Sequence, residues 1–275
     1  MEPTASSTAL VSSALARLGI DTPPKHLSGR KGANTWRAGN WTVKTAVPGA
    51  RGHLAHETDA YTLLHHQGIH PGVQHHHGEA GRWLAVPWID GQSLWDLFAP
   101  AREGHATGEQ RTLMREAARH VLVALEEFHD AGWVHGDMQT ENVIHTRDGR
   151  IEFIDFDNAR HLDLPLSHPY RGGLIHVIAP ETAQQLLATA DTRDVALTPH
   201  AELFALGASL FWSWTGTRIT HYRGAPDGPH PDILTDIAAG RRRNLAADRP
   251  WADPVLERLI TAATRPEPHT RSYRG

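Results

Sequence analysis

The sequence predicts an α+β fold in two parts, a small strand-rich N-terminal part followed by a larger, mainly helical part. Two strand-like runs around a Gly-Asn pair occupy residues 35–45, whereas residues 113–128 and 200–215 carry apolar side chains at helical spacing. No internal repeat is present. The length suits one large domain or two lobes that share a cleft.

The composition excludes several classes of protein. The 275 residues carry 27 Lys and Arg against 31 Asp and Glu, a net charge of -4, so binding to nucleic acid through bulk charge is not expected. Cysteine is absent, which removes disulfides, Cys-ligated zinc and thiol catalysis. No long apolar run or secretory signal is present. We therefore expect a soluble, cytoplasmic protein with no nucleic-acid and no membrane partner.

The N-terminal part is predicted to combine two helices with a small antiparallel sheet. Small hydroxyl residues and Gly19 bound the first helix, Gly39-Asn40 is a two-residue hairpin turn, and Gly68 ends the second helix. The expected elements are a helix over residues 6–18, strands over 35–38 and 41–45, a helix over 53–67, and strands over 72–76 and 83–88.

The C-terminal part is predicted to be mainly helical. A long helix that ends by Gly132 has one apolar face formed by Leu113, Ala117, Val121, Leu125 and Phe128. A short strand follows at residues 151–154. Residues 200–215 are apolar on nearly all sides and predict a central buried helix.

Three oxygen-bearing side chains occur at informative positions. Asp137 and Asn142 lie on one loop within the run His135-Gly136-Asp137-Met138-Gln139-Thr140-Glu141-Asn142, and Asp155 follows the short strand. Hard oxygen ligands suit magnesium, and a carboxylate can orient and deprotonate an alcohol. Asp and Asn also occur in loops for turn geometry alone, and further features in the same order make that alternative the weaker one.

This spacing resembles that of the protein-kinase-like superfamily, which also includes aminoglycoside phosphotransferases. The resemblance implies a bilobal fold. Residues 1–88 would form an N-lobe of a small antiparallel β-sheet plus one helix, preceded by the N-terminal helix, that binds the nucleotide. Residues 89–275 would form the larger, mainly helical C-lobe with the catalytic loop and the acceptor site.

The resemblance also implies cofactors and roles. ATP and Mg²⁺ would be the cofactors, with Asp137 accepting the proton of the acceptor hydroxyl and Asn142 and Asp155 holding the magnesium. Lys44 would hold the α- and β-phosphates, and Glu57 on the next helix would fix its ammonium through an ion pair. Either residue taken alone would more often be a solvated surface charge.

Two further stretches resemble nucleotide-binding parts of the superfamily. Pro87 would offer a backbone carbonyl to adenine and Ile89 a backbone N–H, although a buried strand and turn is the plainer interpretation of that stretch. Residues 29–34 would cover the phosphates with Gly29 and Gly32. This loop has two glycines and not the three of the usual pattern, so by itself it is only a turn-rich loop.

The resemblance continues toward the C-terminus. Ala179-Pro180-Glu181 matches the end of a protein-kinase activation segment, and Arg271 is the expected partner of Glu181. Glu202 lies on the predicted buried helix where Asp is usual.

Four positions depart from the pattern. Gly136 replaces an arginine that would read a phosphate on the activation segment, so control by that route is not expected. Gln139 and Leu174 stand where Ser/Thr kinases have Lys and Thr, and Asp157 replaces the Gly of Asp-Phe-Gly.

The sequence favours an ATP-dependent kinase that phosphorylates Ser or Thr of a protein or peptide, such as a bacterial enzyme that modifies a peptide natural-product precursor. Only 44 residues separate Gly91 from His135, which is short for a small-molecule phosphotransferase. The alternatives are O-phosphorylation of an antibiotic or metabolite, which the His-Gly-Asp run suits, and a nucleotide-binding pseudokinase. The acceptor, the choice between ATP and GTP, and the oligomeric state stay open.

A histidine-rich segment, residues 65–77, could in principle bind zinc or nickel. Because the predicted helix and strand would scatter its side chains, exposed polar residues are the better interpretation.

Overall fold

The computed structural model describes residues 4–30, 33–50, 53–228 and 230–275. The chain packs as two compact units. The first unit extends to Ile89 and also includes Phe156–Asn158 and Leu162–Ser167; the second comprises Asp90–Asp155, Ala159–His161 and the chain from His168 onward. The first unit holds a sheet and two helices and the second is mainly helical, as predicted for an α+β fold.

The first unit contains a five-stranded antiparallel sheet in the order β1-β2-β3-β5-β4. Its strands are β1 (Lys25–Arg30), β2 (Ala33–Ala38), β3 (Trp41–Ala46), β4 (Gln74–Gly78) and β5 (Gly81–Pro87). The predicted hairpin is confirmed as β2 and β3, and Gly39 in its turn has a φ of 57°, which glycine adopts without strain. The strand predicted over residues 72–76 begins two residues later.

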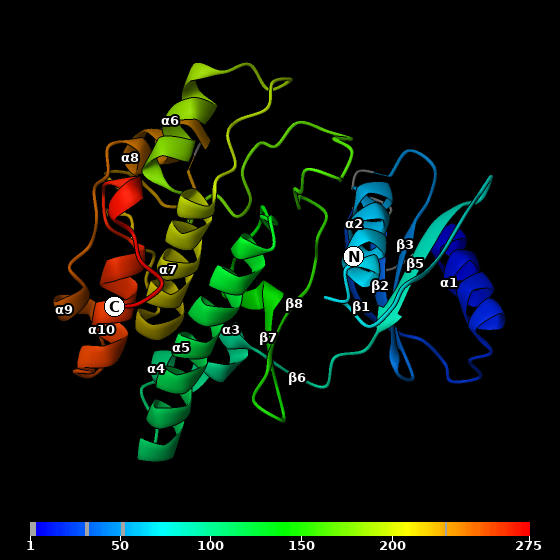
Figure 1. The fold of residues 1–275 in the computed structure, drawn as a ribbon, viewed down its shortest axis with the longest axis horizontal. Coiled ribbons are helices and arrows are strands. Elements are labelled where there is room, and N and C mark those ends of the chain that lie inside the picture. The colour runs from blue at the N-terminus through cyan, green and yellow to red at the C-terminus, as the bar shows by residue number, and fades with distance from the viewer. Residues whose placement is uncertain (1–3, 31–32, 51–52, 229) are drawn as a thin grey trace. The chain divides into compact units, whose positions relative to one another are not determined.

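Two helices cover opposite faces of this sheet, as Figure 1 shows. They are α1 (Ala5–Leu18) and α2 (Leu54–His66), and both were predicted from the sequence. Val11 and Ala14 of α1 pack on Trp36, Val43 and neighbouring apolar residues of the sheet. Since side chains alternate along a strand, the residue after Val43 lies on the face that α2 covers.

The second unit is built around long helices. Its helices are α3 (Leu94–Leu97), α4 (Ala99–Arg102), α5 (Gly108–Asp130), α6 (Pro180–Ala188), α7 (Pro199–Thr215), α8 (His230–Ala238), α9 (Leu245–Asp248) and α10 (Pro254–Ala263). A small sheet joins β6 (Gly91–Ser93), β7 (Val143–Thr146) and β8 (Ile151–Phe153). The α7 helix is buried along most of its length, as predicted, and packs with α5 and α10 in the main core. No helix in the part of the chain that the structure describes is long and apolar enough to cross a membrane.

The predicted apolar face of α5 is correct except at its first residue. Leu113 is 41% exposed, and Met114 is buried instead. Four residues turn a helix through about 400°, so repeated steps of four drift away from the buried face. The correct face therefore starts at Met114 and proceeds to Ala117, Val121 and Leu125.

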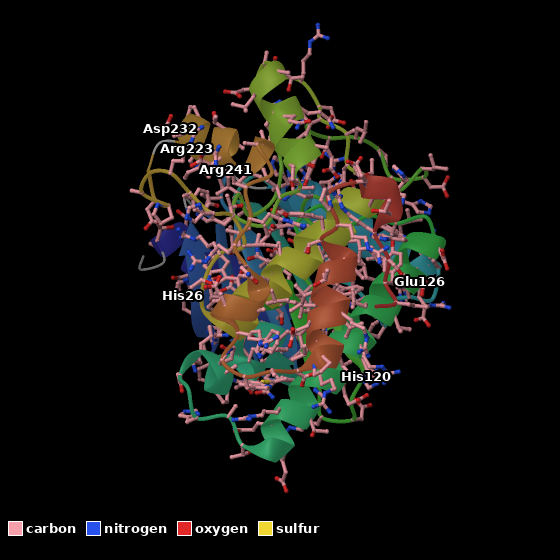
Figure 2. The ribbon with its side chains drawn as sticks, turned by 90° about the vertical axis from the view of Figure 1, so that its left-hand side faces the viewer. His26, His120, Glu126, Arg223, Asp232 and Arg241 are labelled. Carbon is pink, nitrogen blue, oxygen red and sulfur yellow. The ribbon has the colours of Figure 1, made fainter. Side chains whose placement is uncertain are left out.

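Ion pairs hold the C-terminal helices together. Glu181 at the start of α6 accepts hydrogen bonds from Arg271 at 2.5 and 2.9 Å, which confirms the predicted partnership. Near α8, the carboxylate of Asp236 accepts hydrogen bonds from Arg223 and Arg241, both labelled in Figure 2.

Candidate functional site

A buried carboxylate fixes the loop that carries Asp137. Glu202 on α7 accepts hydrogen bonds from the backbone N–H groups of His135, at 2.9 Å, and Gly136, at 2.7 Å. Gly136 has a φ of 84°, a left-handed conformation that favours glycine. His129 on α5 contacts the same carboxylate at 2.8 Å. Burial alone would raise the pKa of Glu202, but the hydrogen bonds from His129 and from the His135 N–H hold it below its ordinary value.

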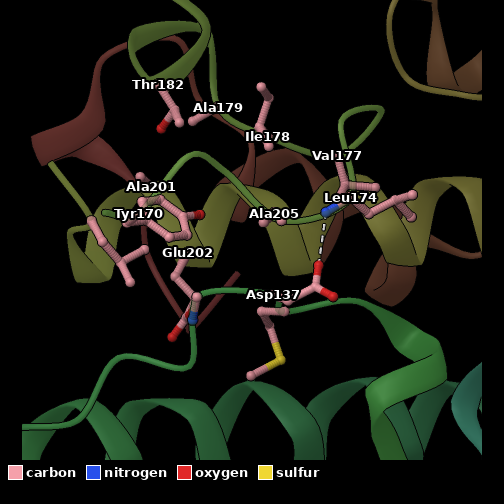
Figure 3. Close-up of a pocket in the computed structure, with 14 residues that line it drawn as sticks. Asp137, Tyr170, Leu174, Val177, Ile178, Ala179, Thr182, Ala201, Glu202 and Ala205 are labelled. Atoms are coloured by element: carbon pink, nitrogen blue, oxygen red, sulfur yellow. Dashed lines mark hydrogen bonds between the residues drawn. The ribbon is translucent and has the colours of Figure 1, made fainter. Parts of the chain in front are cut away.

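The carboxylate of Asp137 is held by three neutral donors, one of which is Nδ2 of Asn142 at 3.3 Å from Oδ2. Its Oδ1 accepts the backbone N–H of Leu174 at 2.7 Å, drawn as a dashed line in Figure 3, and its Oδ2 accepts Nε2 of Gln139 at 2.9 Å. Burial raises the pKa of Asp137, although these hydrogen bonds work in the other direction. These hydrogen bonds fix the orientation of the side chain.

Gly173 lies so close to Asp137 that no side chain fits at position 173. A Cβ added there would lie 2.3 Å from Oδ1 of Asp137 and 2.8 Å from the carbonyl oxygen of Gly136. The adjoining cavity, shown in Figure 3, has a volume of about 20 Å³, enough for about one water molecule. Residues 173–174 thus pack directly against the carboxylate.

Backbone hydrogen bonds bring Asp155 to the same loop. The N–H of Ile154 donates to the carbonyl oxygen of Asn142 at 3.0 Å, and the carbonyl of Ile154 accepts Nε2 of His135 at 2.9 Å. Asp155 follows with a φ of 71°, a conformation that Asp tolerates better than most residues.

The donor set at this point suits magnesium. Nδ2 of Asn142 donates to the carbonyl oxygen of Asp137 at 2.9 Å, which turns the amide oxygen of Asn142 away from that loop. An amide oxygen and the Asp155 carboxylate are the hard ligands that Mg²⁺ prefers. These two residues therefore fit the ion that the sequence suggested.

Lys44 and Glu57 form the expected ion pair within the first unit. Nζ of Lys44, on β3, lies 2.5 Å from Oε1 of Glu57 on α2. The Glu57 side chain is 3% exposed and that of Lys44 is 17% exposed, so the pair is largely shielded from water. A cation on a flexible stem is thereby held in one place.

Pro87, Ile89 and Gly29, which were predicted to bind the nucleotide, lie in or beside strands of the first unit. Pro87 ends β5 opposite Trp41, and the N–H of Trp88 donates to the carbonyl of Asn40 at 2.7 Å. Ile89 follows and is half-buried. Gly29 lies in β1, paired with Asn34 of β2, so part of the expected turn-rich loop is strand. Gly32 lies outside the described residues.

Sequence reasoning missed the donors to Asp137. Gln139 and Leu174 stood out only as departures from a pattern, and nothing in the sequence signals that the Leu174 backbone would donate. It also missed Tyr273, whose hydroxyl contacts His129 at 2.5 Å. In the described ranges, no three His, Asp or Glu side chains gather as a metal site, the histidines of residues 65–77 included.

Arg160 and Arg171 both donate hydrogen bonds to backbone carbonyls. Arg160 donates to the carbonyls of Ala159 and His168 at 3.0 and 2.9 Å. Arg171 donates to the carbonyl of Arg193 at 3.0 Å and to Thr189 Oγ1 at 2.8 Å. These contacts tie Arg160 to residue 168 and Arg171 to residues 189 and 193.

We predict that phosphatase treatment changes activity by less than about twofold, because Gly136 offers no cation to read a phosphate and Arg160 and Arg171 already donate to backbone carbonyls. The measurement is the rate of phosphoryl transfer before and after treatment, with mass spectrometry to verify dephosphorylation. A loss of activity after treatment would show that another basic group reads a phosphate.

Comparison with known proteins gives a family and several relatives. The family described as "Protein kinase domain" matches residues 40–257. A probable serine/threonine-protein kinase of Streptomyces coelicolor is 29% identical over 166 residues, which are 57% of this chain and 24% of that protein. Mitogen-activated protein kinase kinase kinase 5 of Arabidopsis thaliana is 25% identical over 56% of this chain and 23% of its own.

A third relative matches a similar share of this chain. Serine/threonine-protein kinase PAK 4 of Mus musculus is 24% identical over 65% of this chain and 27% of its own length. The chain thus spans about a quarter of the length of the curated relatives that it matches.

Proposed function

This chain belongs to the protein kinase domain family, whose members use ATP and Mg²⁺, and we propose that it transfers the γ-phosphoryl group of ATP to a Ser or Thr hydroxyl of a protein or peptide. The observation that carries the proposal is the fixed carboxylate of Asp137, held by Gln139 and Leu174 beside Asn142. A carboxylate fixed in this way can accept a hydrogen bond from an acceptor hydroxyl and take its proton as the new P–O bond forms.

The other residues of the site bind the phosphoryl donor, ATP. Lys44, fixed by Glu57, binds the α- and β-phosphates. Asn142 and Asp155 hold the magnesium, which neutralises charge on the phosphates when bound.

Residues of the first unit complete the nucleotide site. The carbonyl of Pro87 and the N–H of Ile89 receive adenine. Gly29 and Gly32 approach the phosphates. Residues 1–88 serve as the nucleotide-binding lobe and residues 89–275 as the catalytic and acceptor lobe, and the chain acts in the cytoplasm.

Two features support a protein or peptide acceptor. Two of the three relatives named above are serine/threonine-protein kinases by name. In addition, neutral donors from Gln139 and Leu174 take the places of the Lys and Thr that the sequence lacks, so the loss of those markers leaves the carboxylate oriented. A peptide natural-product precursor is one acceptor of this class.

A small hydroxyl compound, such as an antibiotic or metabolite, is the second candidate. Gly136 favours it, because the His-Gly-Asp run also occurs in small-molecule phosphotransferases of this superfamily. A nucleotide-binding protein without transfer is the third.

The test uses Asp155→Asn as its control variant. Asn keeps the shape of Asp and also tolerates the φ of 71°, so the variant is expected to fold, but it loses the charge that binds magnesium. We expect radiolabelled ATP incubated with lysate of the native host to label the protein fraction with the wild-type chain and not with Asp155→Asn. Label in the small-molecule fraction would support the second candidate. Absence of label from both fractions would contradict the kinase proposal, as would equal labelling by the variant.

A further inference from the structure

The α1 helix lies outside the stretch that matches the family, yet it is hydrogen-bonded into the sheet. The match begins at residue 40, whereas α1 ends at Leu18. Val11, Ala14 and Leu15 pack α1 on the face of the sheet opposite α2, as Figure 1 shows. Beside these apolar contacts, Ser7 is buried and polar. A buried hydroxyl needs a partner, and this one has its partner on β2.

That partner is Asn34, which links three elements. Nδ2 of Asn34 donates to Oγ of Ser7 at 2.9 Å, and its Oδ1 lies 3.0 Å from Nε2 of His26 on β1. Oγ1 of Thr4, which caps α1, donates to Oγ of Ser7 at 3.2 Å. A single buried amide therefore joins α1 to both β1 and β2.

The Asn34 amide also explains why residue 29 is glycine. A Cβ at Gly29 would lie 2.3 Å from Oδ1 of Asn34 and 3.1 Å from Nε2 of His26. The amide thus lies directly against the backbone of β1. Gly29 and Asn34 are also paired across the β1–β2 register.

Strand β1 needs such support because it is an edge strand. Its only neighbour in the sheet is β2, and its register is irregular between His26 and Ser28. Edge strands with one partner and a bulge are less constrained than central strands. The Ser7–Asn34 hydrogen bond constrains the pair from the α1 side.

We propose that Ser7 and Asn34 are positioning residues for the nucleotide, which hold Gly29 and the adjoining ends of β1 and β2 where they can approach the donor phosphates. The inference rests on the proposed function, because it assumes that this chain binds Mg·ATP. It assigns to α1 a part in nucleotide binding beyond its apolar packing.

The test is Ser7→Ala, with Ser12→Ala as its matched control. Ser12 lies on the exposed side of the same helix and donates to the carbonyl of Thr8 at 3.0 Å. Both changes raise helix propensity slightly, so neither is expected to melt α1. Ser7→Ala leaves the buried Nδ2 of Asn34 without its acceptor, which frees the β1–β2 pair.

We expect Ser7→Ala to weaken Mg·ATP binding about tenfold by calorimetry, with Ser12→Ala unchanged. Turnover at saturating ATP should stay within about twofold, because positioning of the donor affects KM and leaves the base at Asp137 untouched. Hydrogen exchange should quicken at the amides of residues 25–38 and not in α5. A general loss of structure would instead change both turnover and exchange throughout the chain.

A double-mutant cycle with Asn34→Ala provides a second measurement. If the two side chains act through one hydrogen bond, the double variant should bind Mg·ATP no more weakly than Asn34→Ala alone. Additive losses, or wild-type affinity in Ser7→Ala, would overturn the inference while leaving the proposed function intact. A wild-type chain that does not bind Mg·ATP would overturn both.

Discussion

Asp137→Ala is expected to retain ATP binding and to lose about 100- to 10,000-fold in phosphoryl transfer, the usual contribution of a general base. In the proposed mechanism the side chain contacts the acceptor hydroxyl, and it is hydrogen-bonded within the second unit, so its removal should leave the Lys44–Glu57 pair in the first unit intact. The measurement is nucleotide affinity by calorimetry together with single-turnover transfer. Asp137→Asn is the matched variant, because it keeps an oxygen that can accept from Leu174 but lacks a carboxylate base.

Lys44→Ala should differ from Asp137→Ala in that it also affects ATP binding. It removes the cation that we propose positions the donor phosphates before and during transfer, so both affinity and rate should fall. Arg should rescue poorly, because its wide planar fork cannot replace a compact ammonium 2.5 Å from Glu57. If the Asp137→Ala variant transfers phosphate at the wild-type rate, the proposed kinase mechanism is wrong even with the fold intact.

The elements with strong local signals were predictable from the sequence. The β2–β3 hairpin follows from its Gly39-Asn40 turn, and α1, α2, α5 and α7 follow from caps and apolar spacing. Strand β1 was not recognised, because it is an edge strand of mostly polar residues whose pairing depends on β2. The contacts of α1 with the sheet were also beyond local reasoning, since they join residues far apart in sequence.

The sequence indicated candidate residues for the site but not the groups that hold them in place. The order of Lys44, Glu57, Asp137, Asn142 and Asp155 predicted the site, and the predicted Lys44–Glu57 ion pair is present.

The donors that orient Asp137 could not be predicted in the same way. One of them is the backbone N–H of Leu174, which any residue type could supply. Whether a backbone N–H reaches Asp137 depends on the fold of the chain, and no residue type in the sequence indicates it.

Gly173→Ala is expected to lower phosphoryl transfer by at least about 100-fold, the effect of a misplacement near 1 Å in a reacting group. The added methyl group would lie 2.3 Å from Oδ1 of Asp137 and 2.8 Å from its Cα, closer than real Cβ contacts allow. Because the Asp137 backbone is held through Gly136 by Glu202, residues 173–174 must move instead. That movement breaks the hydrogen bond from Leu174 and lets the carboxylate rotate.

Gly108→Ala is the control for the substitution itself, since a Cβ there meets open space at the start of α5. ATP affinity should be unchanged in both variants, because neither touches Lys44 or its ion pair. Single-turnover transfer then separates them: Gly108→Ala should match the wild type and Gly173→Ala should not. If Gly173→Ala transfers phosphate at the wild-type rate, the contact between Leu174 and Asp137 is not required in the reacting state. The carboxylate would then be oriented by Gln139 and Asn142, and Gln139→Leu would become the variant expected to lower transfer most.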